Sequence, residues 1–163
     1  MSRTSRSIVV LFVAMLIAAS LSVFATKAAA ERITTSQLPL AAVLVSPCTG
    51  DVVTFTGTAV LTITEDVAPN GSVTVRLSGN VQDPHAAGLL YPYNFKDQLS
   101  SADVVRVADV YKATLTDRMH FIRLGSGGDQ KSDDLFITVV IAATIDSNLI
   151  LKADRIDYRI DCQ

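Results

Sequence analysis

Residues 53–64, which read VTFTGTAVLTIT, carry the clearest structural pattern of the chain. Apolar residues occupy most odd positions from Val53 to Ile63, and threonines occupy most even positions. Side chains of a strand alternate between its two faces, so this pattern predicts a long β-strand with one buried face and one threonine face. An Asn70-Gly71 turn signal follows, and apolar residues then alternate again over 73–78. The two segments are predicted to form an antiparallel hairpin.

The same alternation recurs in the C-terminal third of the chain, on both sides of an Asp146-Ser147-Asn148 turn. No segment beyond the first 30 residues has a helical period. We therefore predict an all-β fold, an antiparallel sandwich or flattened barrel of about seven or eight strands. Besides the hairpin, the expected strands are 42–46, 104–116, 119–124, 135–145 and 149–162.

Residues 1–30 have the three parts of a secretory signal peptide. Arg3 and Arg6 precede an uncharged, largely apolar run, and Ala28-Ala29-Ala30 supplies the small residues for cleavage before Glu31. The run is also just long enough for an uncleaved anchor, because a helix needs about 20 apolar residues to span a bilayer. We expect cleavage and a secreted or periplasmic protein. The mature chain would comprise a loose leader at 31–41 and a single β domain at 42–163, with no integral membrane segment.

The charge balance bears on possible partners. The signal segment holds three of the 14 basic residues and none of the 16 acidic ones, so its removal changes the formal charge from −2 to −5. An acidic chain is poorly suited to a phosphate backbone, and we expect no nucleic-acid partner.

Cys48 and Cys162 are the only two cysteines and bracket most of the mature chain. In an oxidising compartment they most simply form a disulfide, since two thiols are too few for a closed zinc site. On the chain-entropy model, closing so long a loop stabilises the fold by about 4 to 5 kcal/mol.

Candidate catalytic groups are few, and we assign no catalytic residue, metal or cofactor. No Gly-x-Ser-x-Gly nucleophile turn occurs, and the Gly125–Asp129 run lacks the ending of a phosphate-binding loop. Carboxylates occur on or near expected strands at Asp103, Asp109 and Asp117. Asp109 is in register with apolar neighbours and is expected to point inward unless a bulge resets the pattern. A secreted hydrolase using a carboxylate near Asp109 is therefore one alternative.

The least regular segment is Gln82–Ser101, where Pro84, Gly88 and Pro92 interrupt any strand. Long loops often carry binding sites, so we expect a pocket rimmed by this segment and by Gly125–Asp134. The expected ligand contacts are the aromatic and imidazole side chains of His85, Tyr91, Tyr93 and His120. The favoured function is non-enzymatic binding of a small apolar ligand or a surface partner. A further alternative is a structural surface component that self-associates through strand edges, such as the threonine face of Val53–Ile63.

Several of these residues together resemble a group of small, uncharacterised secreted bacterial β proteins. The resemblance rests on Pro47-Cys48-Thr49-Gly50-Asp51, on the threonine-rich strand that follows, on Arg123-Leu124-Gly125-Ser126-Gly127, and on the terminal Asp157–Cys162 strand. It covers the chain from about Ser46 to the C-terminus and matches the middle loop poorly. The resemblance implies export, a β fold and a Cys48–Cys162 bridge, and it implies no particular activity.

Overall fold

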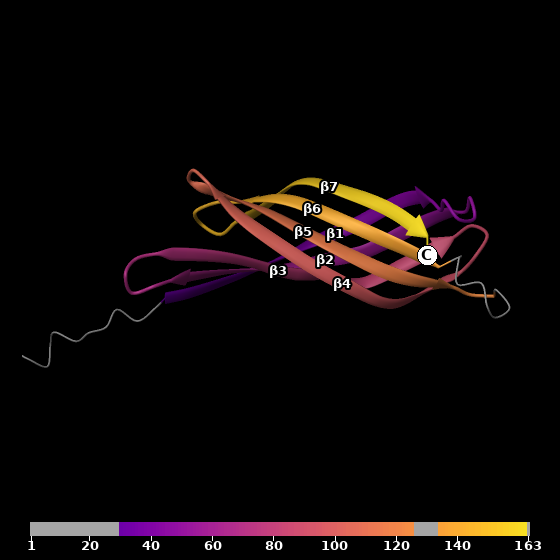
Figure 1. The fold of residues 1–163 in the computed structure, drawn as a ribbon, viewed down its shortest axis with the longest axis horizontal. Coiled ribbons are helices and arrows are strands. Elements are labelled where there is room, and N and C mark those ends of the chain that lie inside the picture. Colours follow the sequence, from indigo (N-terminus) through magenta and orange to yellow (C-terminus); the bar gives the residue numbers. More distant parts are fainter. Residues whose placement is uncertain (1–29, 126–133, 163) are drawn as a thin grey trace, which may run out of the picture.

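The computed structural model describes residues 30–125 and 134–162, and within them it contains seven strands and no helix. All pairings are antiparallel. Strands β1-β2-β3 form one sheet and β4-β5-β6-β7 form the other, and Figure 1 shows the two sheets along a common long axis. The strands are β1 (Ala30–Val45), β2 (Val52–Val67), β3 (Val73–Gly88), β4 (Tyr93–Val107), β5 (Val110–Arg123), β6 (Leu135–Ile145) and β7 (Leu151–Cys162). The predicted all-β fold is confirmed. The described residues form no helix that could cross a membrane.

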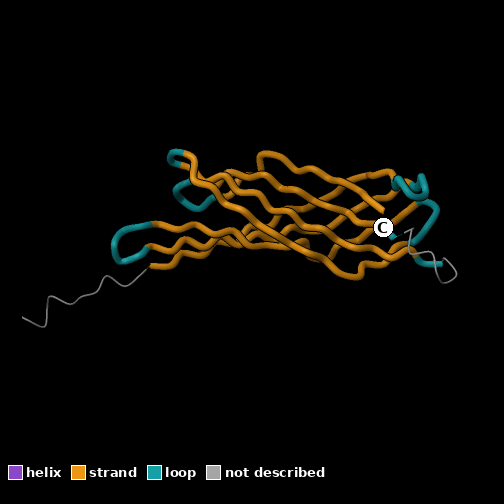
Figure 2. The backbone as a smooth tube through the Cα atoms, in the orientation of Figure 1, coloured by secondary structure: helices purple, strands orange, loops and turns teal. Residues whose placement is uncertain are grey.

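Neighbours in the chain are neighbours in each sheet, so connections between strands lie at the two ends of the sandwich (Figure 2). The predicted hairpin is present as β2 and β3, in which Ile63 lies opposite Leu77. Its turn contains Gly71 with a φ of 83°, a left-handed conformation that glycine adopts at little cost. The signal segment predicted at 1–30 lies outside the described residues, apart from Ala30 at the start of β1.

Residues 31–41, expected as a loose leader, instead form most of β1, which pairs with β2 along its whole length. The inward series of β1 includes Leu38, Leu40 and Leu44, which lie at or beside the core. The outward series also carries large apolar residues, such as Ile33 and Val43. Because apolar residues occur on both faces of β1, its sequence lacks the alternation of apolar and polar residues that predicts a strand.

The hydrophobic core lies between the two sheets and is centred on aromatic and branched side chains. Phe55 of β2 contacts Phe121 of β5 edge to face, with ring centroids 6.3 Å apart, and Tyr158 of β7 at 6.2 Å. In β6 every odd residue from Leu135 to Ile145 is buried. This regular burial explains why the alternation of 135–145 correctly predicted a strand.

Side chains, rather than a continuous backbone ladder, join the two sheets along their edges. Where β3 meets β4, Asp117 of β5 accepts a hydrogen bond from the backbone N–H of Val81. Where β1 meets β7, Tyr158 hydrogen-bonds to the backbone of Ala41. Backbone groups at the sheet edges that have no partner in a neighbouring strand therefore hydrogen-bond to side chains of the other sheet. Buried backbone polar groups require such partners.

The edge strands are β1 and β3 in one sheet and β4 and β7 in the other. The threonine-bearing strand β2 is the centre of its sheet and has neighbours on both sides, so it offers no free edge. In β1, the backbone of Ala41 faces β7, where it hydrogen-bonds to Tyr158. Backbone groups two residues apart in a strand face the same side, so Pro39 also faces this outer edge of β1. Proline has no N–H to donate, and edge prolines prevent further strand addition.

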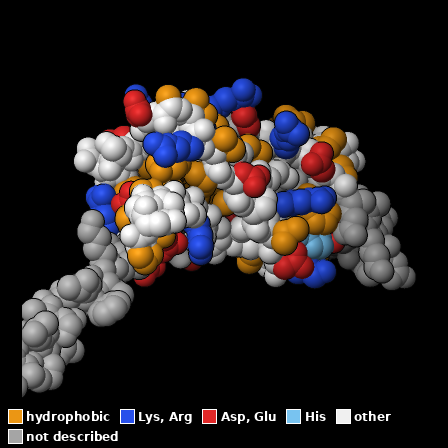
Figure 3. Space-filling model, turned by 60° about the vertical axis from the view of Figure 1, so that its left-hand side comes forward, with side chains coloured by type: hydrophobic (Ala, Val, Ile, Leu, Met, Phe, Trp, Pro, Cys, Tyr) orange, Lys and Arg blue, Asp and Glu red, His pale blue; other side chains and the backbone are white. Residues whose placement is uncertain are grey.

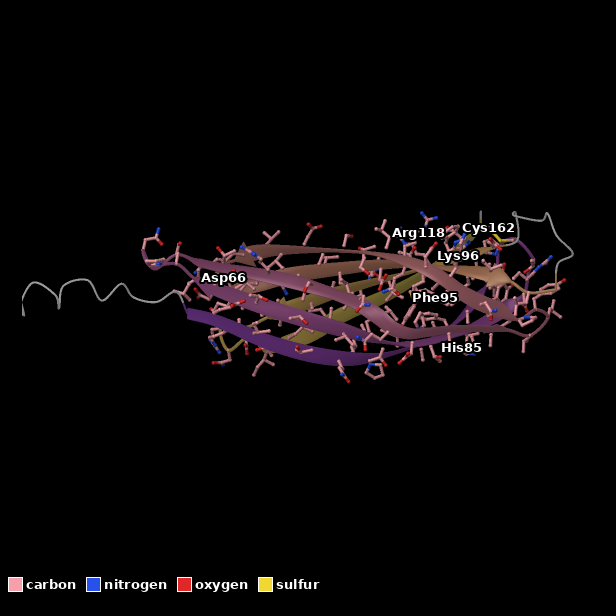
Figure 4. All side chains as sticks on the ribbon, turned by 90° about the horizontal axis from the view of Figure 1, so that it is seen from below. Asp66, His85, Phe95, Lys96, Arg118 and Cys162 are labelled. Atoms are coloured by element: carbon pink, nitrogen blue, oxygen red, sulfur yellow. A yellow bond between two sulfur atoms is a disulfide. The ribbon has the colours of Figure 1, made fainter. Side chains whose placement is uncertain are left out.

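The Cys48–Cys162 disulfide closes one end of the sandwich and joins residues 114 positions apart. Its Cα atoms are 5.9 Å apart, an ordinary separation for a disulfide. The predicted bridge is confirmed. Figure 4 shows Cys162 at the same end of the molecule as His85, Phe95 and Lys96, with Asp66 at the opposite end.

The segment Gln82–Ser101 is far more regular than expected, because β-bulges absorb its irregular residues. Gly57 of β2 faces both Asp83 and Pro84 of β3, so the proline lies in a bulge of an edge strand. A second bulge contains Lys96 in β4. The only connection left in this segment is the short loop 89–92.

Candidate functional site

The loop 89–92 joins the two sheets at the disulfide end and is held by one buried carboxylate. Asp51 is 1% exposed, and its two oxygens accept hydrogen bonds from the backbone N–H groups of Leu90 at 3.0 Å and Tyr91 at 3.2 Å. The N–H of Leu89 donates to the carbonyl of Val52 at 3.0 Å. Three successive backbone donors are thus satisfied from one direction, which fixes the path of the loop.

Gly88 precedes this loop, and no other residue fits its position. A Cβ atom at Gly88 would lie 2.1 Å from Asp51 Oδ2 and 2.5 Å from the carbonyl oxygen of Tyr91. Both distances are far below van der Waals contact, so a side chain there would displace the carboxylate. The close approach of backbone to carboxylate therefore depends on this glycine.

The turn before β2 places the Asp51 carboxylate. The N–H of Ser46 donates to the carbonyl of Asp51, and the N–H of Gly50 donates to the carbonyl of Ser46, both at 2.8 Å. Gly50 has a φ of 69°, and Cys48 in the same turn carries the disulfide. The Pro-Cys-x-Gly-Asp pattern of the sequence thus has a physical role. It anchors the C-terminal strand through its cysteine and the loop 89–92 through its aspartate.

Two shallow pockets flank the loop. The first, of about 390 Å³, is lined by His85, Tyr91 and Tyr93 among others, so the structure brings together three of the four predicted ligand contacts. The second, of about 430 Å³, is lined by Leu90, Tyr91, Arg123 and their neighbours. The guanidinium carbon of Arg123 lies 4.4 Å from the centroid of the Tyr91 ring, a cation–π distance that orients the ring. Tyr91 therefore lines both pockets.

Two leucines project from this fixed loop. Leu89 is 79% exposed and Leu90 is 67% exposed, and Leu124 across the second pocket is 40% exposed. Loop 89–92 and Leu124 are connected, because the Leu124 N–H donates to the carbonyl of Pro92 at 2.9 Å. Leu89 and Leu90 line the first pocket, and Leu90 and Leu124 line the second. Exposed apolar side chains gathered on an ordered surface are typical of interaction sites. We call Leu89, Leu90, Tyr91 and Leu124 the apolar tip.

His120, the fourth predicted contact, does not line either pocket. It is 6% exposed on β5, and its ring is stacked on Phe136 with centroids 4.5 Å apart. Its Nε2 lies 3.1 Å from Asp134 Oδ2, and its Nδ1 lies 3.7 Å from Asp97 Oδ1. Because the two carboxylates lie on opposite ring nitrogens, one metal ion could not contact both carboxylates and the imidazole. Among the described residues, no group of three acidic, histidine or cysteine side chains could hold a metal.

Asp109 is not the buried carboxylate that its register suggested. It is exposed in the turn between β4 and β5, where Ala108 adopts a φ of 54°. The expected strand 104–116 is therefore two strands, and the turn removes Asp109 from the inward series. The predicted inward position of Asp109 is wrong.

The buried carboxylate is Asp117, which is fully shielded from solvent. Burial raises the pKa of Asp117, and hydrogen bonds from the Val81 backbone and the Ser100 side chain only partly oppose this effect. Because no solvent reaches it, this carboxylate ties strands together rather than meeting a substrate. A signal for it was present in the sequence: Asp117 interrupts the odd-numbered series Ala113, Leu115, Met119 and Phe121, all of which are buried.

The face in Figure 3 shows basic and acidic side chains interspersed, with apolar side chains between them. No single sign of charge dominates this face, as it would in an electrostatic binding surface for a polyanion. In comparisons with known proteins, no family model, curated protein or solved structure matches the chain. The arguments about function therefore rest on the geometry of this chain.

Proposed function

We propose that this chain is an exported, non-enzymatic binding protein that receives a small apolar ligand, or the apolar patch of a surface partner, at the apolar tip. The observation that carries the proposal is the pairing of Leu89 and Leu90, mostly exposed, with a loop backbone held by buried Asp51. A loop that only connects two sheets gains nothing from exposed leucines. A loop that presents them in a fixed conformation is organised for binding.

The energetics favour this reading. Full burial of a leucine side chain is worth about 1.5 to 3 kcal/mol. Binding to a flexible loop would lose part of that gain in ordering the backbone, but the hydrogen bonds of Asp51 have already ordered it. The disulfide at the same end adds a second constraint.

The predicted contacts have distinct roles in this proposal. His85 is exposed and Tyr91 is half-buried, so both can touch a ligand in the first pocket. Tyr93 is 4% exposed and serves as the floor of that pocket. His120 lies away from both pockets, and we assign it a structural role between Asp97 and Asp134.

Export is part of the proposal and rests on the signal-like sequence of residues 1–30 together with the disulfide, a bond typical of oxidising compartments. Membership in the group of small secreted bacterial proteins is likewise proposed. It is supported by the joint role of Cys48 and Asp51, two residues of the shared motif, at the disulfide end.

The test uses the apolar fluorophore N-phenyl-1-naphthylamine as a probe, with Leu89→Ser and Leu90→Ser as variants. Leu99→Ser is the matched control, because Leu99 is 76% exposed on β4, outside both pockets at the tip. We expect each tip variant to weaken probe binding about tenfold while the control binds as the wild type does. Equal binding by all four proteins would overturn the proposal. In a separate measurement, native mass spectrometry of the exported protein would identify a natural ligand that stays bound.

A further inference from the structure

A third pocket, a groove, lies away from the apolar tip, where edge strands β3 and β4 of the two sheets run past each other. This groove has a volume of about 670 Å³, within the range of small-molecule sites. Both strands carry a β-bulge at its lining, one at Asp83 and Pro84 and the other at Lys96. Bulges bend a strand and redirect its side chains, so they shape the groove from both sides.

The lining of the groove combines planar polar groups with one aromatic ring. Its residues are Asn80, Val81, Gln82, Asp83, Pro84, Phe95, Asp97 and Gln98. Three carboxamides and two carboxylates supply hydrogen-bond donors and acceptors, and Val81 and Pro84 add apolar surface beside the ring. The number of polar side chains distinguishes this groove from the apolar tip.

The aromatic ring is held in place from behind. Phe95 is 42% exposed, and its other side contacts the buried ring of Phe121 edge to face, with centroids 5.8 Å apart. Figure 4 shows Phe95 beside Lys96 on this part of the molecule. A half-exposed ring that is fixed by a core residue forms a ready platform for stacking.

Backbone geometry at the groove is also specific. Asp83 has a φ of 48°, a left-handed conformation that is uncommon for residues other than glycine. The distance between Oδ1 of Asp97 and Nδ1 of His120 is 3.7 Å, so one oxygen of the Asp97 carboxylate faces the imidazole. Both carboxylates of the groove therefore belong to β-strands, Asp83 to β3 and Asp97 to β4.

From this lining we infer that the groove binds an uncharged saccharide, with a pyranose ring stacked on Phe95 and its hydroxyls hydrogen-bonded to the carboxamides and carboxylates. Carboxamides can both donate to and accept from vicinal hydroxyls, and carboxylates accept from them. The C–H face of a sugar ring packs on an aromatic face. Asp83 and Asp97 would repel an acidic sugar, so a neutral ring is favoured over a uronate. This site is separate from the apolar tip, and neither proposal depends on the other.

The experiment titrates the full exported chain with cellohexaose, maltohexaose, chitohexaose and a galacturonic acid hexamer, followed by ¹⁵N–¹H NMR shifts and calorimetry. We expect at least one of the three neutral oligomers to bind and to shift the amides of 80–83 and 95–98, and the acidic oligomer not to bind. Failure of all three neutral oligomers, or shifts confined to other residues, would overturn the inference.

Variants then test the assigned contacts. Phe95→Leu keeps an apolar side chain against Phe121 but removes the flat ring, and we expect it to weaken the neutral oligomer about tenfold. A second variant, Gln82→Ala, changes an exposed side chain and tests the hydrogen bonds without touching the core. Leu90→Ser at the apolar tip is the control and should bind the oligomer normally. Unchanged affinity in both groove variants would overturn the assignment.

Discussion

The backbone N–H of Val81 on β3 donates a hydrogen bond of 2.5 Å to Oδ2 of Asp117, which belongs to β5 in the opposite sheet. The carboxylate reaches past the seam between β3 and β4 and satisfies an edge donor that no strand pairs. It thereby ends the hydrogen-bonding edge of β3 and ties the two sheets together. A buried acid in a hydrophobic core is costly, and the donor that it satisfies offsets only part of this cost.

Replacing Asp117 should show how much this hydrogen bond contributes to the free energy of unfolding. Asp117→Leu leaves the Val81 N–H buried without an acceptor and should lower the free energy of unfolding by about 1 to 3 kcal/mol. Asp117→Asn keeps an acceptor oxygen and should lose less. Urea denaturation followed by circular dichroism measures both, since the chain has no tryptophan. Equal losses in the two variants would show that the hydrogen bond to Val81 contributes nothing measurable.

The raised pKa of Asp117 predicts a pH dependence of a definite sign. Because burial raises this pKa in the folded state above the ordinary value of 3.8, the native chain binds the proton more tightly than the unfolded chain does. The penalty for the charged carboxylate is fully present above the folded pKa and is relieved as the pH falls toward 3.8. Wild type should therefore gain stability relative to Asp117→Asn as the pH is lowered from neutral toward 4.

The comparison with Asp117→Asn isolates this effect from other acids. Asp154 has a lowered pKa, chiefly through the hydroxyl of Thr144 and then through Lys112, and its contribution is lost on acidification. Both proteins contain Asp154, so the difference between their unfolding free energies cancels it. A difference that stays constant from pH 7 to pH 4 would contradict the raised pKa.

Removing the disulfide should destabilise the whole sandwich. The Cys48→Ser, Cys162→Ser double variant frees a loop of more than 100 residues and should lose about 4 to 5 kcal/mol on the chain-entropy model. Urea denaturation with and without reductant is the measurement. Reduced wild type should unfold at the same midpoint as the double variant. A wild type that is indifferent to reductant would mean that the bond does not form in the exported protein.

Gly88→Ala tests whether close packing against Asp51 fixes the loop 89–92. The added Cβ would lie 2.1 Å from Asp51 Oδ2, so we expect a loss of about 1 to 3 kcal/mol and weaker binding of the apolar probe. Gly71→Ala, in the turn between β2 and β3 and outside both pockets at the tip, is the control. Its φ of 83° strains an alanine, but nothing lies within 4 Å of the new Cβ. If both variants bound the probe as the wild type does, the carboxylate would not control the apolar tip.

The local pattern of the sequence predicted several elements correctly because their burial alternates without interruption. In β6 each inward position is apolar, and the hairpin of β2 and β3 has both the alternation and the turn signal. Two errors arose where one residue changes the register. Ala108 in a left-handed conformation makes a turn inside an apparently continuous strand, and Asp117 inside a strand looked like a strand end.

Part of the candidate site was also visible in the sequence. His85, Tyr91 and Tyr93, three of the predicted ligand contacts, line one pocket because they are close in the chain. His120 lies outside that pocket, since its surroundings depend on the pairing of β5 with β6 and on contacts with Asp97 and Asp134. Asp51 drew attention only as part of a motif, because its hydrogen-bond donors lie 39 and 40 residues away.

The sequence alone was enough to predict most of the strands and the disulfide. Strands follow from the local alternation of apolar and polar residues, and two cysteines can form only one intramolecular bridge. Only the tertiary structure decided which carboxylates are buried and what they hold. Asp51 and Asp117 accept hydrogen bonds from backbone groups distant in sequence, and those donors exist only after the strand edges have been placed. Burial of a polar group depends on partners supplied by the whole fold, which no local pattern contains.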